Sequence, residues 1–133
     1  MPDLPRYRAL LVEDDSAIRR LVEKLLTRRG VAIDAVADGR RAIEHLDGGT
    51  RYDAVILDLM VPEVSGFDVI RHVYEHHRHI PIAVVSAVSQ QALTQLDARV
   101  VKLVISKPFD VDAFTKGVLG LCEERGEAKV VSG

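Results

Sequence analysis

Short apolar runs recur along the chain, and each is followed by a segment with apolar residues at helical spacing. The runs occupy residues 8–12, 31–36, 54–57, 82–85 and 101–105. Nearly every position in them is apolar, which is expected of strands covered on both faces of a sheet. Strands that alternate with helices predict an α/β fold, here a doubly wound (βα)5 arrangement around a five-stranded parallel sheet.

Polar residues mark where the predicted helices begin and end. Ser16 is placed to cap the first helix, and Gly30 is placed to end it. Asp38 and Asp110 are placed to cap the second and the last helix, and a polar helix is predicted around residues 90–96. These signals give each apolar run a helix of its own.

Length and composition favour one soluble domain. The 133 residues suit a single domain, which we expect over residues 1–126, with a flexible tail at 127–133. The formal charge of -2 gives no basic footprint for nucleic acid or an anionic membrane. No apolar run approaches the roughly 20 residues that span a bilayer. The first residues lack a signal peptide, and a single cysteine, Cys122, suits a reducing compartment, so a cytoplasmic location is expected.

Polar side chains gather at the carboxyl ends of the predicted strands, where open parallel sheets bind ligands. The first strand supplies Glu13, Asp14 and Asp15. The third strand supplies Asp58, the fourth Ser86 and the fifth Lys107. Two carboxylates about 5 Å apart repel by roughly 3 kcal/mol at an effective dielectric of about 20. Such a cluster must take up protons, hold a cation or contact a lysine, and its hard oxygen ligands suit Mg²⁺.

A phosphoryl-accepting aspartate is the chemistry that these residues favour. A cation beside Asp58 would neutralise an incoming phosphoryl group, while Lys107 and the Ser86 hydroxyl would bind its oxygens. A nucleotide or flavin site would need a glycine-rich turn after the first strand, and a hydrolase elbow would need Gly-x-Ser-x-Gly; the chain has neither. A metal-dependent phosphatase is disfavoured because Met60 stands where a second acid is usual.

At these residues the chain resembles the receiver domain of two-component response regulators, over about residues 7–124. The resemblance is carried by LVEDD at 11–15, LDLMVPEVSG at 57–66, VVSA at 84–87 and SKPF at 106–109. It implies a flavodoxin-like fold with strand order 2-1-3-4-5. It also implies a cis Lys107-Pro108 bond, and access to Ser86 past the small Ala87.

The resemblance further implies the roles of the site residues and the partners of the chain. Asp58 would accept a phosphoryl group from a sensor histidine kinase or a histidine phosphotransfer protein. Mg²⁺ would be held by Glu13, Asp14, Asp58 and the main-chain carbonyl of Met60, and Ser86 and Lys107 would bind phosphoryl oxygens. The protein would be no enzyme beyond slow self-phosphorylation and self-dephosphorylation at Asp58.

Output would come through the face made by the helix near 90–96, the strand 101–105 and the last helix. That face would contact a protein partner or a second copy of the chain, with no direct contact to nucleic acid or membrane. A stand-alone regulator, a relay and a piece of a larger protein remain open. A different class also remains open, a protein-interaction module that keeps the receiver fold and signals without phosphate.

Three departures from the family pattern bear on this hypothesis. Val104 stands where the family often has an aromatic switch residue, and it can equally be a core residue. Met60 and Val88 offer no polar group to place a hydrolytic water, which predicts slow loss of phosphate. Residues 97–101 lack the usual Gly-Ala, which predicts that the preceding helix is shortened or shifted.

Four histidines lie between residues 72 and 79, and His72 and His76 stand at i, i+4. A transition metal could use that pair. No carboxylate or cysteine near them in the sequence completes a ligand set, so a partly solvated face is favoured. Cys122 is expected to be a small packing residue.

Overall fold

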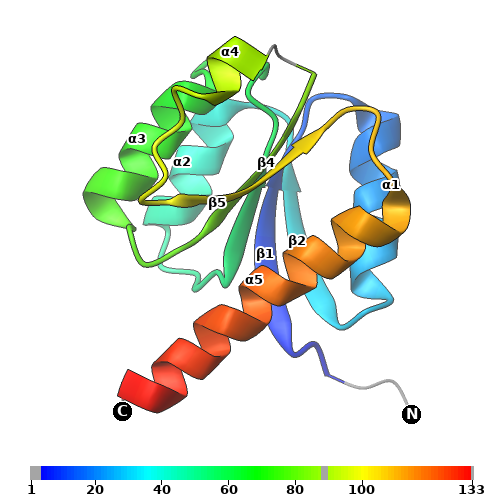
Figure 1. Cartoon of the computed structure of the whole chain (residues 1–133), viewed down its shortest axis with the longest axis vertical. Coiled ribbons are helices and arrows are strands. Elements are labelled where there is room, and N and C mark those ends of the chain that lie inside the picture. The colour runs from blue at the N-terminus through cyan, green and yellow to red at the C-terminus, as the bar shows by residue number, and fades with distance from the viewer. Residues whose placement is uncertain (1–3, 88–89, 133) are drawn as a thin grey trace.

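The computed structural model describes residues 4–87 and 90–132 and contains a five-stranded sheet in the order β2-β1-β3-β4-β5 (Figure 1). The strands are β1 (Tyr7–Val12), β2 (Val31–Val36), β3 (Ala54–Leu57), β4 (Ile82–Ser86) and β5 (Val101–Ser106). Neighbouring strands all pair in parallel. The predicted fold class and strand order are confirmed.

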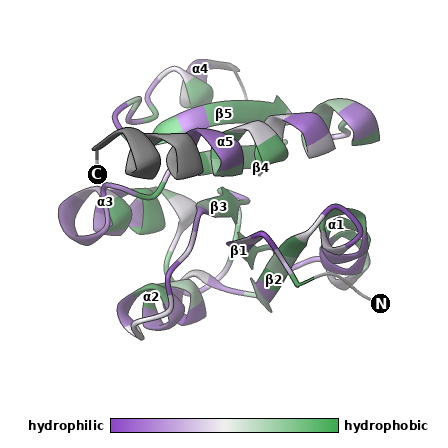
Figure 2. Ribbon diagram, turned by 90° about the horizontal axis from the view of Figure 1, so that it is seen from below, coloured by the Kyte–Doolittle hydropathy of each residue, from purple (hydrophilic) through white to green (hydrophobic). Residues whose placement is uncertain are grey.

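Helices cover both faces of the sheet (Figure 2). They are α1 (Ser16–Thr27), α2 (Gly39–Asp47), α3 (Gly66–His76), α4 (Gln90–Leu93) and α5 (Val111–Ser132). Leu26 of α1 and Phe114 of α5 belong to one apolar core, and Leu46 of α2 and Val73 of α3 belong to the other. Each face of the sheet therefore has its own core. Cys122 is buried in the first of these, as expected of a packing residue.

The strands differ in how far they are covered. Every residue of β3 and β4 is buried, as predicted for strands with helices on both faces. In β5 the residues at 102, 104 and 106 are exposed, while Leu103 and Ile105 pack against the core beside α5. The prediction of full coverage is therefore wrong for β5, because it is an edge strand and the short α4 leaves its other face open.

The segment before β5 is irregular. The predicted helix at 90–96 is only four residues long in the structure, and the pairing of β4 with β5 shifts register between Ile82 and Ala83. A turn replaces the rest of the helix, in which the Leu96 amide donates to the Leu93 carbonyl at 3.3 Å, and a second turn follows in which the Asp97 carbonyl accepts from the amides of Val100 and Val101. The expected shortening is confirmed.

Side-chain caps define the helix starts, with one correction to the predictions. The Asp15 carboxylate accepts hydrogen bonds from the amides of Ala17 and Ile18, so Asp15 and not Ser16 caps α1. A carboxylate fills this position well because it also meets the positive end of the helix dipole. Asp38 and Asp110 cap as predicted, at 2.8 Å and 2.9 Å from the amides they accept.

The carboxyl-terminal helix α5 continues to Ser132. The boundary at residue 126 between the domain and a flexible tail stays a prediction. Over the described residues, no helix combines the length and the apolar character needed to cross a membrane.

Candidate functional site

The site lies at the carboxyl edge of the sheet, where the backbone ladder continues past the strand ends. The Glu13 amide donates to the Val36 carbonyl and the Asp58 amide to the Val12 carbonyl, each at 3.0 Å. At the same edge, where β4 and β5 end, the Lys107 amide donates to the Ser86 carbonyl at 3.0 Å. Residues far apart in the chain are thereby held at fixed positions beside one another.

Lys107 joins the two buried carboxylates of the site. Its Nζ lies 2.6 Å from Glu13 Oε1 and 2.9 Å from Asp58 Oδ2. The Glu13 and Asp58 side chains are only 4% and 9% exposed, so both charges are nearly out of water. A single ammonium group therefore compensates two carboxylates, which leaves the centre with a net negative charge.

Asp58 is engaged through both oxygens. Its Oδ1 accepts a hydrogen bond from the Met60 amide at 3.0 Å and one from the Ser86 hydroxyl at 3.3 Å, while Oδ2 faces Lys107. The sequence-predicted residues are therefore linked in one chain of contacts, from Glu13 to Lys107, from Lys107 to Asp58 and from Asp58 to Ser86.

The pKa values of the centre follow from this burial and pairing. Burial raises the pKa of Glu13, although Lys107 and the Asp15 amide oppose the change. Burial acts to lower the pKa of Lys107, but its hydrogen bonds to Glu13 and Asp58 outweigh this and raise that pKa. The lysine is thus held in its charged form at neutral pH.

Three carboxylates are arranged to share a cation. Glu13, Asp14 and Asp58 each offer an oxygen within 4.8 Å of the others, and Asp14 is exposed while the other two are buried. An all-oxygen set that opens to solvent on one side fits Mg²⁺, which keeps several of its waters in protein sites. Asp15 is turned away from this set, since its side chain caps α1.

Arg19 is a site residue that the sequence analysis missed. Its Nη1 donates to the main-chain carbonyls of Glu13 at 2.8 Å and Asp14 at 3.3 Å. The guanidinium thereby fixes the backbone of the acidic turn without touching the carboxylates. The signal was weak, because an arginine on the polar face of a first helix has nothing in its spacing to distinguish it.

Two glycines allow the loop after Asp58 to pack closely. A Cβ atom on Gly66 would lie 2.5 Å from Leu59 Cα, and one on Gly39 would lie 1.8 Å from the Val64 carbonyl oxygen. The Gly39 amide also donates to the Pro62 carbonyl at 3.2 Å. The loop is therefore clamped between the starts of α2 and α3, which fixes the main chain at Met60.

The structure can be compared with the features in which the chain follows or departs from the family pattern. The Lys107-Pro108 bond is cis, as the resemblance implied. Val104 is 43% exposed, so its interpretation as a core residue is wrong. The Met60 side chain is 66% exposed beside the site, and Ala87 is exposed next to Ser86. Val88 lies outside the described residues.

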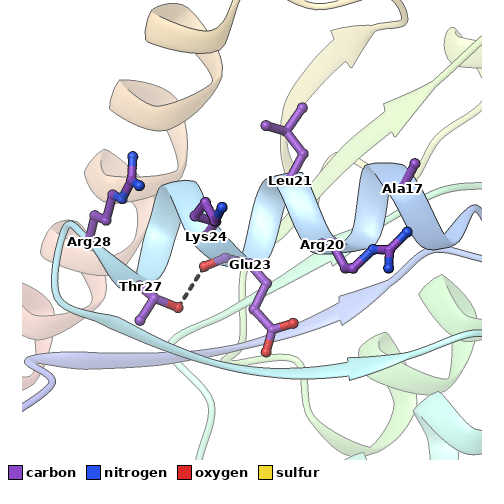
Figure 3. Close-up of a pocket in the computed structure, with 7 residues that line it drawn as sticks. All are labelled: Ala17, Arg20, Leu21, Glu23, Lys24, Thr27 and Arg28. Atoms are coloured by element: carbon purple, nitrogen blue, oxygen red, sulfur yellow. Dashed lines mark hydrogen bonds between the residues drawn. The ribbon is translucent and has the colours of Figure 1, made fainter.

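Over the residues that the structure describes, two larger surface hollows lie away from the acidic site, one along α1 and one beside the start of β2. A hollow of about 690 Å³ runs along α1, lined by Leu21, several charged side chains and Thr27, whose hydroxyl donates to the Glu23 carbonyl at 2.6 Å (Figure 3). On the core side of Glu13 and Asp58 there is space of only about 10 Å³. Ligands therefore reach the carboxylates from solvent, over Asp14 and Met60.

A parallel sheet that gathers two buried acids, a hydroxyl and a lysine at its carboxyl edge defines a receiver-type signalling domain. The profile of the response regulator receiver domain family matches residues 9–119, and the chain belongs to that family.

Similar proteins and structures agree with this assignment. The transcriptional regulatory protein TcrA of Mycobacterium tuberculosis is 40% identical over 80 residues, which cover 60% of this chain and 31% of that protein. The transcriptional regulatory protein DltR of Streptococcus agalactiae is 36% identical over 107 residues, 79% of this chain and 47% of that protein. The chain thus spans less than half the length of these relatives.

Solved receiver structures share the fold. The signal receiver domain of a putative Luxo repressor protein from Vibrio parahaemolyticus superimposes with a TM-score of 0.89 and 25% identity, over 96% of this chain and 98% of that one. The response regulator TrrA of Thermotoga maritima, solved in complex with Mg²⁺-BeF, gives a TM-score of 0.77 and 28% identity, over 86% and 98%.

Proposed function

We propose that this receiver domain accepts a phosphoryl group on Asp58 and acts in a two-component phosphorelay. The observation that supports this most directly is the set of groups that surround the Asp58 carboxylate. Asp58 faces Lys107 at 2.9 Å and the Ser86 hydroxyl at 3.3 Å, and it shares a cation-sized gap with Glu13 and Asp14. Donors for phosphoryl oxygens and ligands for a cation thus surround one nucleophilic oxygen.

The transfer forms one bond and breaks one. An oxygen of Asp58 forms the new O–P bond as the N–P bond of a phosphohistidine breaks, and the imidazole leaves with the electron pair and takes up a proton. Lys107 gives up its contact with Asp58 Oδ2 and donates to a phosphoryl oxygen, while Ser86 donates to another. Glu13 keeps its contact with Lys107 and so limits how far the ammonium moves.

Glu13, Asp14, Asp58 and the main-chain carbonyl of Met60 are the proposed Mg²⁺ ligands. The ion, when bound, neutralises phosphoryl oxygens next to the acids. Arg19 holds the backbone of Glu13 and Asp14 in place, and the clamped loop holds the Met60 carbonyl. The Mg²⁺-BeF complex of TrrA, at 28% identity, supports this ligand class.

The donor of the phosphoryl group is a sensor histidine kinase or a histidine phosphotransfer protein, and the site of action is the cytoplasm. Added charge at Asp58 pulls on Ser86 at the end of β4, next to the α4-β5-α5 surface. The exposed Val104 on β5 gives that surface an apolar centre for a protein partner or a second copy of the chain.

The first prediction tests the acceptor. Intact mass measured after incubation with acetyl phosphate is expected to show a gain of one phosphoryl group that depends on Mg²⁺. Asp58→Asn removes the nucleophilic carboxylate and should show no gain. Asp53→Asn, an acid outside the cluster, is the matched control and should gain like the wild type.

The outcomes separate the two classes of function. A gain that survives in Asp58→Asn would place the acceptor elsewhere. No gain in any protein, together with no binding of Mg²⁺, would overturn the proposal in favour of the phosphate-independent interaction module. A gain only with a histidine phosphodonor protein would retain the acceptor and restrict the donor.

A further inference from the structure

A second cluster of ligand-type side chains lies at the opposite edge of the sheet from Asp58. Asp47 is the last residue of α2, His72 lies in α3 four residues before its end, and His77 is the C-cap of α3. Helices in a parallel α/β fold run antiparallel to the strands they follow, so helix ends face the amino edge of the sheet. This cluster and the acidic site are therefore separate.

The three side chains converge on one oxygen. His72 Nε2 and His77 Nε2 each lie 2.8 Å from Asp47 Oδ1. Both imidazoles are only 19% exposed, whereas the Asp47 side chain is 50% exposed. The sequence analysis missed Asp47 because it stands 25 residues before His72, and it paired His72 with His76 instead.

The surroundings of the cluster favour positive charge. The carboxyl ends of α2 and α3 both point to it, and each carries the partial negative charge of a helix dipole. The site thus combines one carboxylate, two helix ends and two imidazole side chains in one place.

We propose that Asp47, His72 and His77 form a second metal site, which binds Zn²⁺ or a similar transition-metal ion through two imidazole nitrogens and one carboxylate oxygen. Three protein ligands with one position left for water is a common zinc arrangement. Imidazole nitrogen selects such ions over Mg²⁺, whose preferred ligands are oxygens. The two ends of the domain would then hold different cations.

Small movements complete the geometry. Ligand atoms around a tetrahedral zinc ion lie about 3.3 Å apart when each is about 2.0 Å from the metal. The Nε2–Oδ1 distances must therefore lengthen by about 0.5 Å. The half-exposed Asp47 carboxylate can make this movement by rotating its side chain, which leaves α3 in place.

A plain hydrogen-bonded link between α2 and α3 is the competing interpretation. Two imidazoles donating to one carboxylate would join the helices without any ion. That interpretation predicts that the link is complete without metal and gains nothing when metal is added. The two interpretations therefore differ in a measurement of binding.

The test is a calorimetric titration of Zn²⁺ into the untagged chain, with Mg²⁺ in large excess so that the acidic site does not compete. We expect one Zn²⁺ per chain. Because loss of even an outer-shell partner typically weakens metal sites tenfold or more, His72→Ala or His77→Ala should weaken binding by at least about tenfold. Co²⁺ in place of Zn²⁺ should give the visible absorption of a four-coordinate ion in the wild type and not in these variants.

His76→Ala is the matched control. His76 lies between the two ligands in sequence, its ring centroid is 4.7 Å from that of His72, and it is not one of the three converging groups. It should bind Zn²⁺ like the wild type, and circular dichroism without metal should show that all variants are folded. No uptake by the wild type, or an equal loss in His76→Ala and His77→Ala, would overturn the proposal. The gain of one phosphoryl group from acetyl phosphate should be the same in His77→Ala as in the wild type, since the acidic site is separate.

Discussion

At the residue scale, Tyr52 is the largest fully buried side chain among the described residues. Its hydroxyl donates a 2.7 Å hydrogen bond to Asp34 Oδ2, and the other oxygen of Asp34 accepts from Arg8 at 3.0 Å. Burial, followed by the bond to Asp34, raises the pKa of Tyr52. The neutral phenol is therefore the form that the fold stabilises.

Tyr52→Phe should lower the free energy of unfolding at pH 7 by about 1–2 kcal/mol, because a hydrogen bond to a charged group is lost. Above pH about 10 the tyrosine ionises in the unfolded wild type but keeps its proton in the folded protein. The free energy of unfolding of the wild type therefore falls with pH, whereas the variant has no phenol at this position and shows no such fall. Urea unfolding at pH 7 and pH 10.5 should show the difference shrinking. A difference that stays constant or widens would contradict this account.

Met60 controls a different property at the same scale. Its exposed thioether side chain stands beside Asp58 and cannot hold a water in line with an aspartyl phosphate. Met60→Asn places an amide there and should shorten the lifetime of the phosphorylated protein, measured by intact mass over time. Met60→Leu is the apolar control and should leave the lifetime near that of the wild type. An unchanged lifetime in the asparagine variant would be evidence against the role of this position.

At this scale, residues can be predicted from the sequence where their role depends on their position at the end of a strand. They cannot be predicted where their role depends on how a helix or turn packs. Asp58 and Ser86 could be identified because each directly follows an apolar run, and Lys107 because it stands two residues after one. Asp15 was passed over for Ser16 as the cap, because both types cap well and only the backbone turn selects between them. Arg19 depends on the rotation of α1 about its axis, which periodicity alone does not set.

At the element scale, glycines make opposite contributions in α2 and α5. Gly120 in α5 has open space where a Cβ would stand, and glycine costs about 1 kcal/mol relative to alanine inside a helix. Gly39 at the start of α2 has the Val64 carbonyl in that space. One glycine is thus a cost to its helix and the other is required by a close approach.

Gly120→Ala should raise the free energy of unfolding by about 0.5–1 kcal/mol. Gly39→Ala should lower it by about 1–3 kcal/mol, because the loop after Asp58 must shift to make room. Chemical denaturation of the two variants provides the comparison. Stabilisation by Gly39→Ala would show that the loop is not clamped as described.

The elements themselves were predicted with unequal success. The bounds of β2 and β3 agree residue by residue, because Gly30 and the polar residues around 50–53 and 58 limit them sharply. The coverage of β5 was misjudged, since an apolar composition does not reveal whether a strand is central or at an edge. Its exposed face at 102, 104 and 106 follows from the short α4.

At the scale of the whole molecule, Lys107 contacts two of the acids that are the proposed ligands of Mg²⁺. Removing Lys107 leaves Glu13 and Asp58 buried without a cation, and an uncompensated buried charge is costly. A ligand that binds only the folded state stabilises it by mass action. The metal-free protein should therefore depend on the lysine more than the Mg²⁺-bound protein does.

Lys107→Ala should lower the Tm without Mg²⁺, and the rise in Tm on adding Mg²⁺ should be larger in this variant than in the wild type. Lys102→Ala is the control, because Lys102 is an exposed residue of β5, the strand that Lys107 follows, and its ammonium donates to the main-chain carbonyl of Ala98. Differential scanning calorimetry gives both values. An equal or smaller Mg²⁺ response in Lys107→Ala would show that the lysine and the ion act on different groups.

The contact between Lys107 and Glu13 joins residues that are 94 positions apart. During synthesis the acidic turn therefore leaves the ribosome long before Lys107 exists, and until then this lysine cannot compensate Glu13 or Asp58. Charge compensation of the two buried acids therefore forms only after the final strand of the sheet has been made. Any truncated product that lacks β5 and Lys107 would lack this charge compensation as well, and under the proposed function it should accept a phosphoryl group poorly.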